Sequence, residues 1–279
     1  MIKIVADSTC NLEPDVLERH DIRVAPITIQ FGNESYTEGV DIDRDLFYRK
    51  IEEQGIIPTT SQPTPAWFER FYRDLHQHGH TILTITITSK HSGTHQSAVL
   101  ARSLVPEADV EVFDSASLSL GTGWMILEAA QAAEAERDRP WIVRRLEEIR
   151  RKAKLYLTPA TLKYLQMSGR VGKLQGALGS LLNVKPIIAL EEGLLEAKQN
   201  VRTRGKAIER LLELMEQAFG GATPLNLAVI HARARDEAED LLRRARSRFN
   251  CRGILSGDLV CSLAVHGGPG VIGLFAYPV

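Results

Sequence analysis

The feature that constrains the fold most lies in the first half of the chain. There, short apolar segments alternate with helical patterns. Apolar runs typical of buried strands lie at residues 2–6, 24–31, 81–88 and 110–113. Amphipathic helical patterns separate or follow them, one of them capped by Asp43. Strands and helices that alternate at these lengths form a mostly parallel sheet with right-handed crossovers. We therefore expect an N-terminal three-layer α/β domain over residues 1–155.

The pattern changes near residue 155, and the rest predicts a C-terminal α+β domain over residues 156–279. Residues 184–190 and 194–201 are typical of a hairpin, and Thr203 caps a strongly amphipathic helix. The tail, from residue 261 to 277, predicts two apolar strands broken by a glycine-rich turn. The two halves have no flexible linker between them, so we expect them to pack closely.

Overall composition excludes several classes of protein. The 279 residues carry a net charge of −1, which gives no electrostatic basis for binding nucleic acid. The three cysteines lack metal-ligand spacing and are interpreted as reduced thiols of the cytoplasm. We see neither a signal peptide nor an apolar stretch long enough to cross a bilayer, so we expect a cytoplasmic location.

Two hydroxyl-rich loops are the main candidates for a binding site. In the first, Thr60 and Ser61 lie between two prolines, just before a helix predicted to start at Thr64 and Pro65. The second is Ser92-Gly93-Thr94, which follows the strand at 81–88. Helix amino ends at the carboxyl edge of a parallel sheet favour small polar or anionic ligands. A purely structural role in helix capping is the alternative for both loops.

Motifs for other chemistries are absent from the sequence. There is no phosphate-binding loop ending in Gly-Lys-Ser/Thr and no Gly-x-Gly-x-x-Gly after the first strand. Ser92 does not sit in a nucleophile elbow, and the histidines form no zinc motif. We therefore predict no catalytic residue, no metal ligand and no cofactor. Arg170 and His266, each beside glycines, are two further candidates to reach the same crevice, although a lone arginine or histidine is more often structural.

Seven short motifs, in this order and spacing, resemble the DegV family of bacterial fatty-acid-binding proteins. They are Ala6-Asp7-Ser8-Thr9, Thr60-Ser61-Gln62-Pro63-Thr64-Pro65, Ser92-Gly93-Thr94 with Gln96-Ser97-Ala98, Asp114-Ser115, Leu162-Lys163-Tyr164-Leu165 with Ser168-Gly169-Arg170, Lys185-Pro186-Ile187, and His266-Gly267-Gly268-Pro269-Gly270. Each motif alone is weak, but together they span essentially the whole chain.

The resemblance implies a two-domain protein that buries a long-chain fatty acid, such as palmitate (hexadecanoate), in the cleft between its domains. It implies that Thr60 and Ser92 hold the carboxylate, with Ser61, Gly93 and Thr94 in the same loops. Arg170 and His266 match the family residues close to the head group. The resemblance further implies a non-catalytic role, in which the acid is presented to a separate ATP-dependent fatty acid kinase subunit.

Two other hypotheses remain open at this point. The chain could act alone as an enzyme of the kinase or hydrolase class on a small phosphorylated or acyl substrate, although it lacks a nucleotide loop. It could also be an interaction module, which would leave its polar loops without a purpose. The chain length of the acid, the partner and the oligomeric state are not specified by the sequence.

Overall fold

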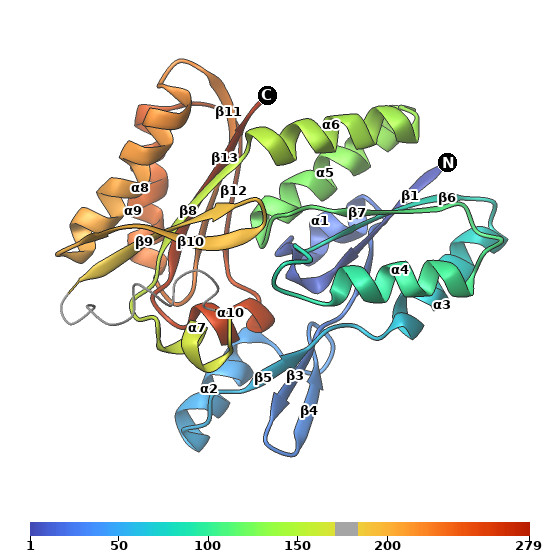
Figure 1. Cartoon of the computed structure of the whole chain (residues 1–279), viewed down its shortest axis with the longest axis horizontal. Coiled ribbons are helices and arrows are strands. Elements are labelled where there is room, and N and C mark those ends of the chain that lie inside the picture. Colours follow the sequence, from blue (N-terminus) through green and yellow to red (C-terminus); the bar gives the residue numbers. More distant parts are fainter. Residues whose placement is uncertain (171–183) are drawn as a thin grey trace. The chain divides into compact units, whose positions relative to one another are not determined.

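The structure is a computed structural model that describes residues 1–170 and 184–279 (Figure 1). Its contacts divide the chain into two compact units. The first unit comprises Met1–Arg150 with Val260–Ser262, and the second comprises Arg151–Leu259 and Leu263–Val279. The glycine-flanked loop predicted around Arg170 continues past residue 170 and there lies outside the described residues.

The first unit is built on a parallel sheet of four strands in the order β2-β1-β6-β7. Its strands are β1 (Ile2–Asp7), β2 (Arg23–Ala25), β6 (Thr81–Thr86) and β7 (Val110–Asp114). The predicted parallel sheet is therefore confirmed. Because β1 is followed by β2 on one side and by β6 on the other, the topological switch point lies at the carboxyl ends of β1 and β6.

Helices cover both faces of this sheet and complete the three predicted layers (Figure 1). On one face, Phe68 and Tyr72 of α3 and Ala98 of α4 pack with Val5 and Ile82 of the sheet. On the other face, α5 contacts β1 and β6. The helices of this unit are η1 (Ser8–Cys10), α1 (Pro14–Arg19), α2 (Arg44–Gln54), α3 (Pro65–Gln77), α4 (Thr94–Leu104), α5 (Leu120–Glu134) and α6 (Arg139–Lys152).

The apolar run at residues 24–31 is not one strand, as the pattern predicted, but two. It ends as β2 at Ala25 and resumes as β3 (Thr28–Phe31), which belongs to a separate antiparallel sheet with β4 (Glu34–Thr37) and β5 (Thr59–Ser61). Proline at position 26 has no backbone donor for a ladder, and the amide of Ile27 donates to Ser8 Oγ over 3.0 Å. The chain therefore leaves the parallel sheet at this point.

The predicted helix caps are confirmed where a side-chain carboxylate or hydroxyl accepts a hydrogen bond from an amide of the first turn. Asp43 accepts from the amide of Leu46 at 2.7 Å and caps α2 as predicted. Thr64 occupies the N-cap of α3, but its side chain makes no capping hydrogen bond. In α5 the residue before the first helical position is Ser119, and its side chain likewise makes no capping hydrogen bond.

The second unit contains a mixed sheet of six strands in the order β10-β9-β8-β13-β11-β12. The predicted hairpin is confirmed as β9 and β10, and β12 went unrecognised in the sequence. Only β11 and β12 run parallel among the described pairs of this sheet. The strands are β8 (Lys154–Thr158), β9 (Lys185–Glu191), β10 (Leu194–Val201), β11 (Pro224–His231), β12 (Asn250–Asp258) and β13 (Ile272–Pro278), and the helices are α7 (Lys163–Met167), α8 (Arg204–Phe219) and α9 (Arg235–Arg248).

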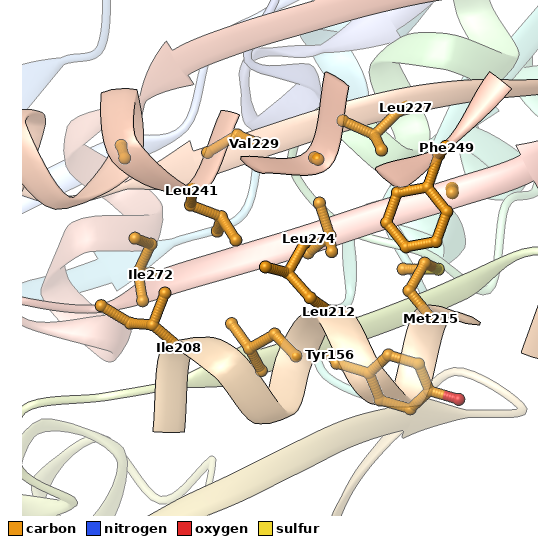
Figure 2. Packing of buried hydrophobic residues seen from close by; sticks show 14 of the residues in the cluster. Tyr156, Ile208, Leu212, Met215, Leu227, Val229, Leu241, Phe249, Ile272 and Leu274 are labelled. Carbon is orange, nitrogen blue, oxygen red and sulfur yellow. The ribbon is translucent and has the colours of Figure 1, made fainter. Parts of the chain in front are cut away.

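The core of this unit lies between the sheet and the helices α8 and α9 (Figure 2). Leu227 and Leu274 of the sheet face Leu212 of α8 and Leu241 of α9, and all four side chains are buried. Burying a leucine side chain contributes about 1.5–3 kcal/mol, so this layer is the main stabilising contact of the unit.

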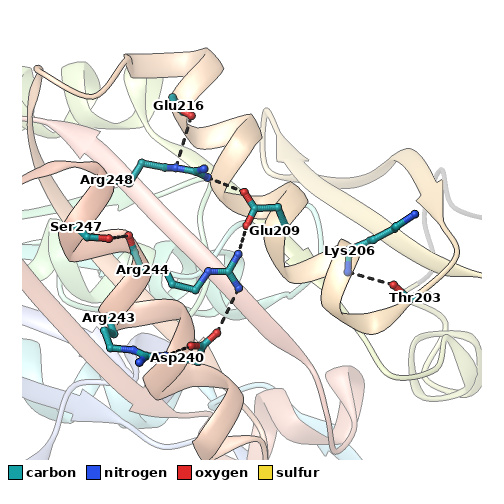
Figure 3. Close-up of polar contacts among 9 residues, drawn as sticks. All are labelled: Thr203, Lys206, Glu209, Glu216, Asp240, Arg243, Arg244, Ser247 and Arg248. Atoms are coloured by element: carbon teal, nitrogen blue, oxygen red, sulfur yellow. Dashed lines mark hydrogen bonds and ion pairs between the residues drawn. The ribbon is translucent and has the colours of Figure 1, made fainter.

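An ion-pair network also joins α8 to α9 at the surface (Figure 3). Glu209 of α8 accepts from Arg244 and Arg248 of α9, and Arg244 also contacts Asp240 at 3.2 Å. The same view shows Thr203 accepting from the amide of Lys206 at 3.3 Å, which confirms the predicted cap of α8. Half-exposed ion pairs contribute little one by one, so the apolar layer dominates the packing of these helices.

The tail differs from its prediction, since its first apolar segment is the helix α10 (Cys261–Gly267) and only the second is a strand, β13. Short apolar runs do not distinguish strand from helix. At the start of this helix the carboxylate of Glu38 accepts from the amide and hydroxyl of Ser262, both at 2.7 Å. That contact satisfies an amide that the first turn of a helix leaves without an intrahelical partner.

Candidate functional site

The switch point of the first unit is organised by the buried carboxyl group of Asp7, the last residue of β1. Asp7 accepts hydrogen bonds from the amide and hydroxyl of Thr9 and from the amide of Ile87, the latter at 2.9 Å. Ile87 follows β6, so one carboxylate ties together the loops that leave both strands at the switch point. The loops beyond Thr9 and Ile87 are therefore held at the sheet edge where ligands bind in folds of this kind.

The two hydroxyl-rich loops predicted from the sequence meet in the structure. A Cβ atom placed on Gly93 would lie 2.6 Å from Cδ of Gln62 and closer still to its amide oxygen and nitrogen. Gln62 Nε2 also donates to Ser97 Oγ over 3.4 Å. The loop that carries Thr60 and Ser61 thus touches the loop that carries Ser92, and the glycine at position 93 makes this approach possible.

The second loop leads directly into α4. Gly93 is the N-cap residue, so Ser92 lies one position before the cap instead of forming it. Ser92 Oγ accepts from the amide of Thr94 at 3.3 Å and lies 2.8 Å from the hydroxyl of Thr94. The Ser92 hydroxyl is half-buried and stands beside a helix amino end, where partial positive charge favours an anionic group.

The first loop supplies Thr60 from an edge strand. Thr60 is half-buried in β5 and is paired with Ile29 of β3, while Ser61 is exposed and paired with Thr28. The pairing with β3 fixes the backbone of both residues, so the side chain of Thr60 projects from a defined position next to Gln62. Thr60, Ser61, Ser92, Gly93 and Thr94 accordingly belong to two touching loops of the first unit, in which Thr94 is buried.

Two carboxyl groups of this unit, Asp7 and Glu38, are buried. Burial raises the pKa of Asp7, although the hydrogen bonds from Thr9 and Ile87 act in the opposite direction. Burial likewise raises the pKa of Glu38, against the effect of hydrogen bonds from Ser8 and Ser262. Both groups hold their protons more strongly than an exposed carboxyl does, and their oxygens are engaged in structural contacts.

Glu38 and Asn11 were not singled out from the sequence, but they anchor the segment Val260–Ser262. Asn11 Oδ1 accepts from the amide of Val260 at 2.9 Å, and Glu38 holds Ser262 as described above. These contacts join residues more than two hundred positions apart. No local pattern in a single sequence signals such a pairing.

The other two predicted site residues lie in the second unit, and their segments contact each other. Tyr164 of α7 packs on Gly268, because a Cβ there would lie 2.6 Å from Cγ of the ring. His266 precedes this glycine at the end of α10. Arg170 follows α7, and its amide donates to the carbonyl of Leu165 at 3.0 Å. The motifs that contain Arg170 and His266 therefore contact each other through Tyr164 and Gly268.

Neither a metal site nor a membrane span is found in the part of the chain that the structure describes. No group of three or more histidine, cysteine, aspartate or glutamate residues there could hold a metal ion. Nor does any helix at residues 1–170 or 184–279 have the length and apolar character needed to cross a bilayer.

These features define an α/β protein whose first unit presents two touching hydroxyl-bearing loops near a topological switch point. The family model described as "Uncharacterised protein, DegV family" matches residues 1–279. A DegV domain-containing protein of Caldanaerobacter subterraneus is 32% identical over 274 residues, covering 98% of both chains. Protein DegV of Bacillus subtilis is 31% identical over 274 residues, again covering 98% of each chain. The chain belongs to the DegV family, as the sequence motifs predicted.

Several solved structures share the fold of this chain. A DegV family protein from Thermus thermophilus, described under fatty acid binding, has 33% identity and a TM-score of 0.95, covering 100% of this chain and 99% of that one. DegV from Bacillus subtilis, described as a fatty acid binding protein, has 30% identity and a TM-score of 0.92 over 100% and 99% of the two chains. A stearic acid-binding protein from Eubacterium ventriosum has 27% identity and a TM-score of 0.92 over 100% and 98%.

Proposed function

We propose that this protein binds a long-chain fatty acid, with Thr60 and Ser92 holding its carboxylate. The observation that carries the proposal is the contact between the loops of these two residues, made by Gln62 against Gly93. Descriptions of three solved relatives as fatty acid binding proteins support the choice of ligand. The site of the acyl tail between the two predicted domains, and roles for Arg170 and His266, stay predictions from the family resemblance.

The tail and the carboxylate of such a ligand contribute to its binding free energy in different ways. Each buried methylene contributes about 0.8 kcal/mol to the binding free energy, so a tail of about sixteen carbons supplies on the order of 10 kcal/mol. The entropy lost when the ligand and the surrounding side chains become ordered reduces this amount. A buried carboxylate needs hydrogen-bond donors, because leaving it unpaired would cancel much of that gain. Two hydroxyl groups beside a helix amino end meet this need without a permanent positive charge, which suits a carboxyl group that reacts later.

We further propose that the bound acid is presented to a separate ATP-dependent kinase that forms an acyl phosphate. The sequence has a candidate carboxylate site but no nucleotide-binding loop, and this combination supports a division of labour between two chains. The purified protein should then consume no ATP by itself, even with palmitate present. Turnover of ATP or of an ester by the protein alone would favour the stand-alone enzyme instead.

Mass spectrometry of the native protein, purified from cells, tests the ligand directly. We expect an added mass equal to that of a long-chain fatty acid, and uptake of palmitate or oleate by stripped protein. Ser92→Ala should weaken palmitate binding by about 1–3 kcal/mol, through the loss of a hydrogen bond to a charged group. Ser103→Ala is the matched control, since that exposed hydroxyl only donates to the carbonyl of Leu100. Unchanged affinity in Ser92→Ala would remove Ser92 from the site.

A further inference from the structure

Arg204, the first residue of α8, uses its guanidinium group to join three segments of the second unit. Nη1 donates to the carbonyl of Thr158 at the end of β8 over 3.0 Å, and Nη2 donates to the carbonyl of Gly270 over 2.7 Å. Nε and Nη2 also donate to Glu237 near the start of α9, at 3.0 and 2.8 Å. The Arg204 side chain is only 22% exposed. All three guanidinium nitrogens therefore have fixed partners.

The carbonyl of Gly270 belongs to the turn that follows His266. This turn, residues 267–270, is also held by backbone hydrogen bonds from Gly268 to Ala264 at 2.8 Å and from Gly270 to Ala232 at 2.7 Å. Gly268 and Gly270 have positive φ angles of 71° and 82°, which glycine adopts without strain. The glycines make the turn sterically possible but leave it mobile unless other groups fix it. Arg204 supplies such a contact from outside the turn.

Arg235, at the start of α9 in the same unit, has a different role. Arg235 is 82% exposed and pairs with Glu239 one helical turn away. This ion pair lies within one helix and does not hold the backbone of another segment in position. Arg204 instead donates to two backbone carbonyls, and Glu237 compensates its charge through two nitrogens. A guanidinium group holds this geometry because its donors form a rigid planar fork, whereas a lysine ammonium acts as a single point charge.

We propose that Arg204 is a positioning residue for fatty acid binding, which acts by fixing the turn that carries His266. The inference rests on the proposed function and extends it to a residue that is not one of the predicted carboxylate ligands. Thr158, which supplies the other carbonyl, ends β8, an interior strand of the six-stranded sheet, so Arg204 connects the turn to that strand. Removing the guanidinium group frees the Gly270 carbonyl and lets the backbone after His266 move.

Two variants and two controls test this proposal. Arg204→Gln removes the guanidinium group and its positive charge. Arg204→Lys keeps the positive charge but has only a single ammonium group as donor. Arg235→Gln makes the same charge change without loss of a backbone contact. Leu241→Ala destabilises the unit from its core without touching the turn. Each protein is measured for palmitate affinity, by displacement of a fluorescent fatty acid, and for hydrogen exchange of the Gly268 and Gly270 amides without ligand.

We expect Arg204→Gln to lower palmitate affinity about tenfold and to speed exchange of the turn amides about tenfold, since one lost charge-assisted contact corresponds to that factor. Arg204→Lys should recover part of both effects, and Arg235→Gln should change neither. Leu241→Ala should speed exchange throughout the sheet instead of mainly at the turn. Matching losses of affinity in Leu241→Ala and Arg204→Gln would overturn the proposal, because general destabilisation would then explain both.

The remaining outcomes are also decisive. Faster exchange at the turn with unchanged affinity in Arg204→Gln would make the residue structural only and refute its role in binding. Unchanged exchange would refute the claim that Arg204 fixes the turn, whatever the affinity. If the unaltered protein binds no fatty acid, the proposed function fails and the role of Arg204 in it fails too, while the exchange measurement still shows whether the residue holds the turn.

Discussion

The contact between Gly268 and Tyr164 allows a quantitative test of how tightly the His266 turn is packed. Gly268 has a φ angle of 71°, and a Cβ there would lie 2.6 and 2.7 Å from ring atoms Cγ and Cε2 of Tyr164. Gly268→Ala therefore incurs two separate costs. The left-handed backbone costs about 1–2 kcal/mol, and forcing a methyl group against the ring costs about 1–3 kcal/mol. The total loss of unfolding free energy should be about 2–5 kcal/mol.

A double-mutant cycle separates these costs. In a Tyr164→Ala background the steric term disappears, so Gly268→Ala should cost only about 1–2 kcal/mol. Gly169→Ala is the matched control in the same unit, because Gly169 has the same φ angle of 71° and would place its Cβ in open space. That change should also cost about 1–2 kcal/mol, whether or not Tyr164 is present.

The assay has to report on the second unit alone. All three tryptophans, Trp67, Trp124 and Trp141, lie within the first unit, so tryptophan fluorescence in urea serves as the internal control. Hydrogen exchange of peptides from β8 and β13, measured over increasing urea, gives the unfolding free energy of the second unit. The reasoning is refuted if Gly268→Ala costs the same with and without the Tyr164 ring, since the ring would then yield freely.

Three further predictions follow from burial. Leu241→Ala should lower the unfolding free energy of the second unit by about 2–5 kcal/mol in the same exchange assay, because it leaves a cavity in the core; a loss below about 1 kcal/mol would contradict the packing. The raised folded-state pKa of Glu38 means that its contribution to stability is fully present below the ordinary carboxyl pKa of 4.5 and is lost as the pH rises through the raised value. Urea unfolding followed by tryptophan fluorescence should therefore show a weaker loss of stability with rising pH in Glu38→Gln; an unchanged pH profile would refute this. Burial raises the pKa of Cys10 and Cys261 to about 12, so iodoacetamide at neutral pH should label the half-buried Cys251 first, and early labelling of either buried thiol would contradict the structure.

The parallel sheet of the first unit could be predicted because its signals are local. The strand at Thr81–Thr86 alternates threonine with apolar residues, and Asp43 and Thr203 are caps whose partners lie three residues ahead. The position of one of the two hydroxyl-rich loops could be anticipated for a related reason. The end of β6 and the start of α4 place Ser92 at the carboxyl edge of the parallel sheet. The Thr60 loop lies in the separate sheet of β3, β4 and β5, and only the helix start that follows it was visible in the sequence.

The predictions were wrong where the local structure makes contacts with residues far away in the sequence. The segment at Cys261–Gly267 is helical with a carboxylate from Glu38 at its first turn, 224 positions away. Proline at position 26 was visible in the sequence, but the separate sheet that receives β3 depends on pairing with β5, some thirty residues on. The contacts of Arg204 have no sequence signal at all, because an arginine after a helix cap is usually a surface residue.

The place of β13 in the second sheet has a consequence for how the protein is made. β13 comes last in the described chain, yet it lies between β8 and β11. While a ribosome is still synthesising the preceding residues, the facing edges of β8 and β11 have no neighbour, and buried side chains such as Leu157 and Val229 stay in contact with water. The N-terminal unit can gain most of its structure during translation, whereas the second sheet closes only once its final strand emerges. Exposed strand edges pair readily with other chains, so this late step is where we expect newly made molecules to be most dependent on chaperones.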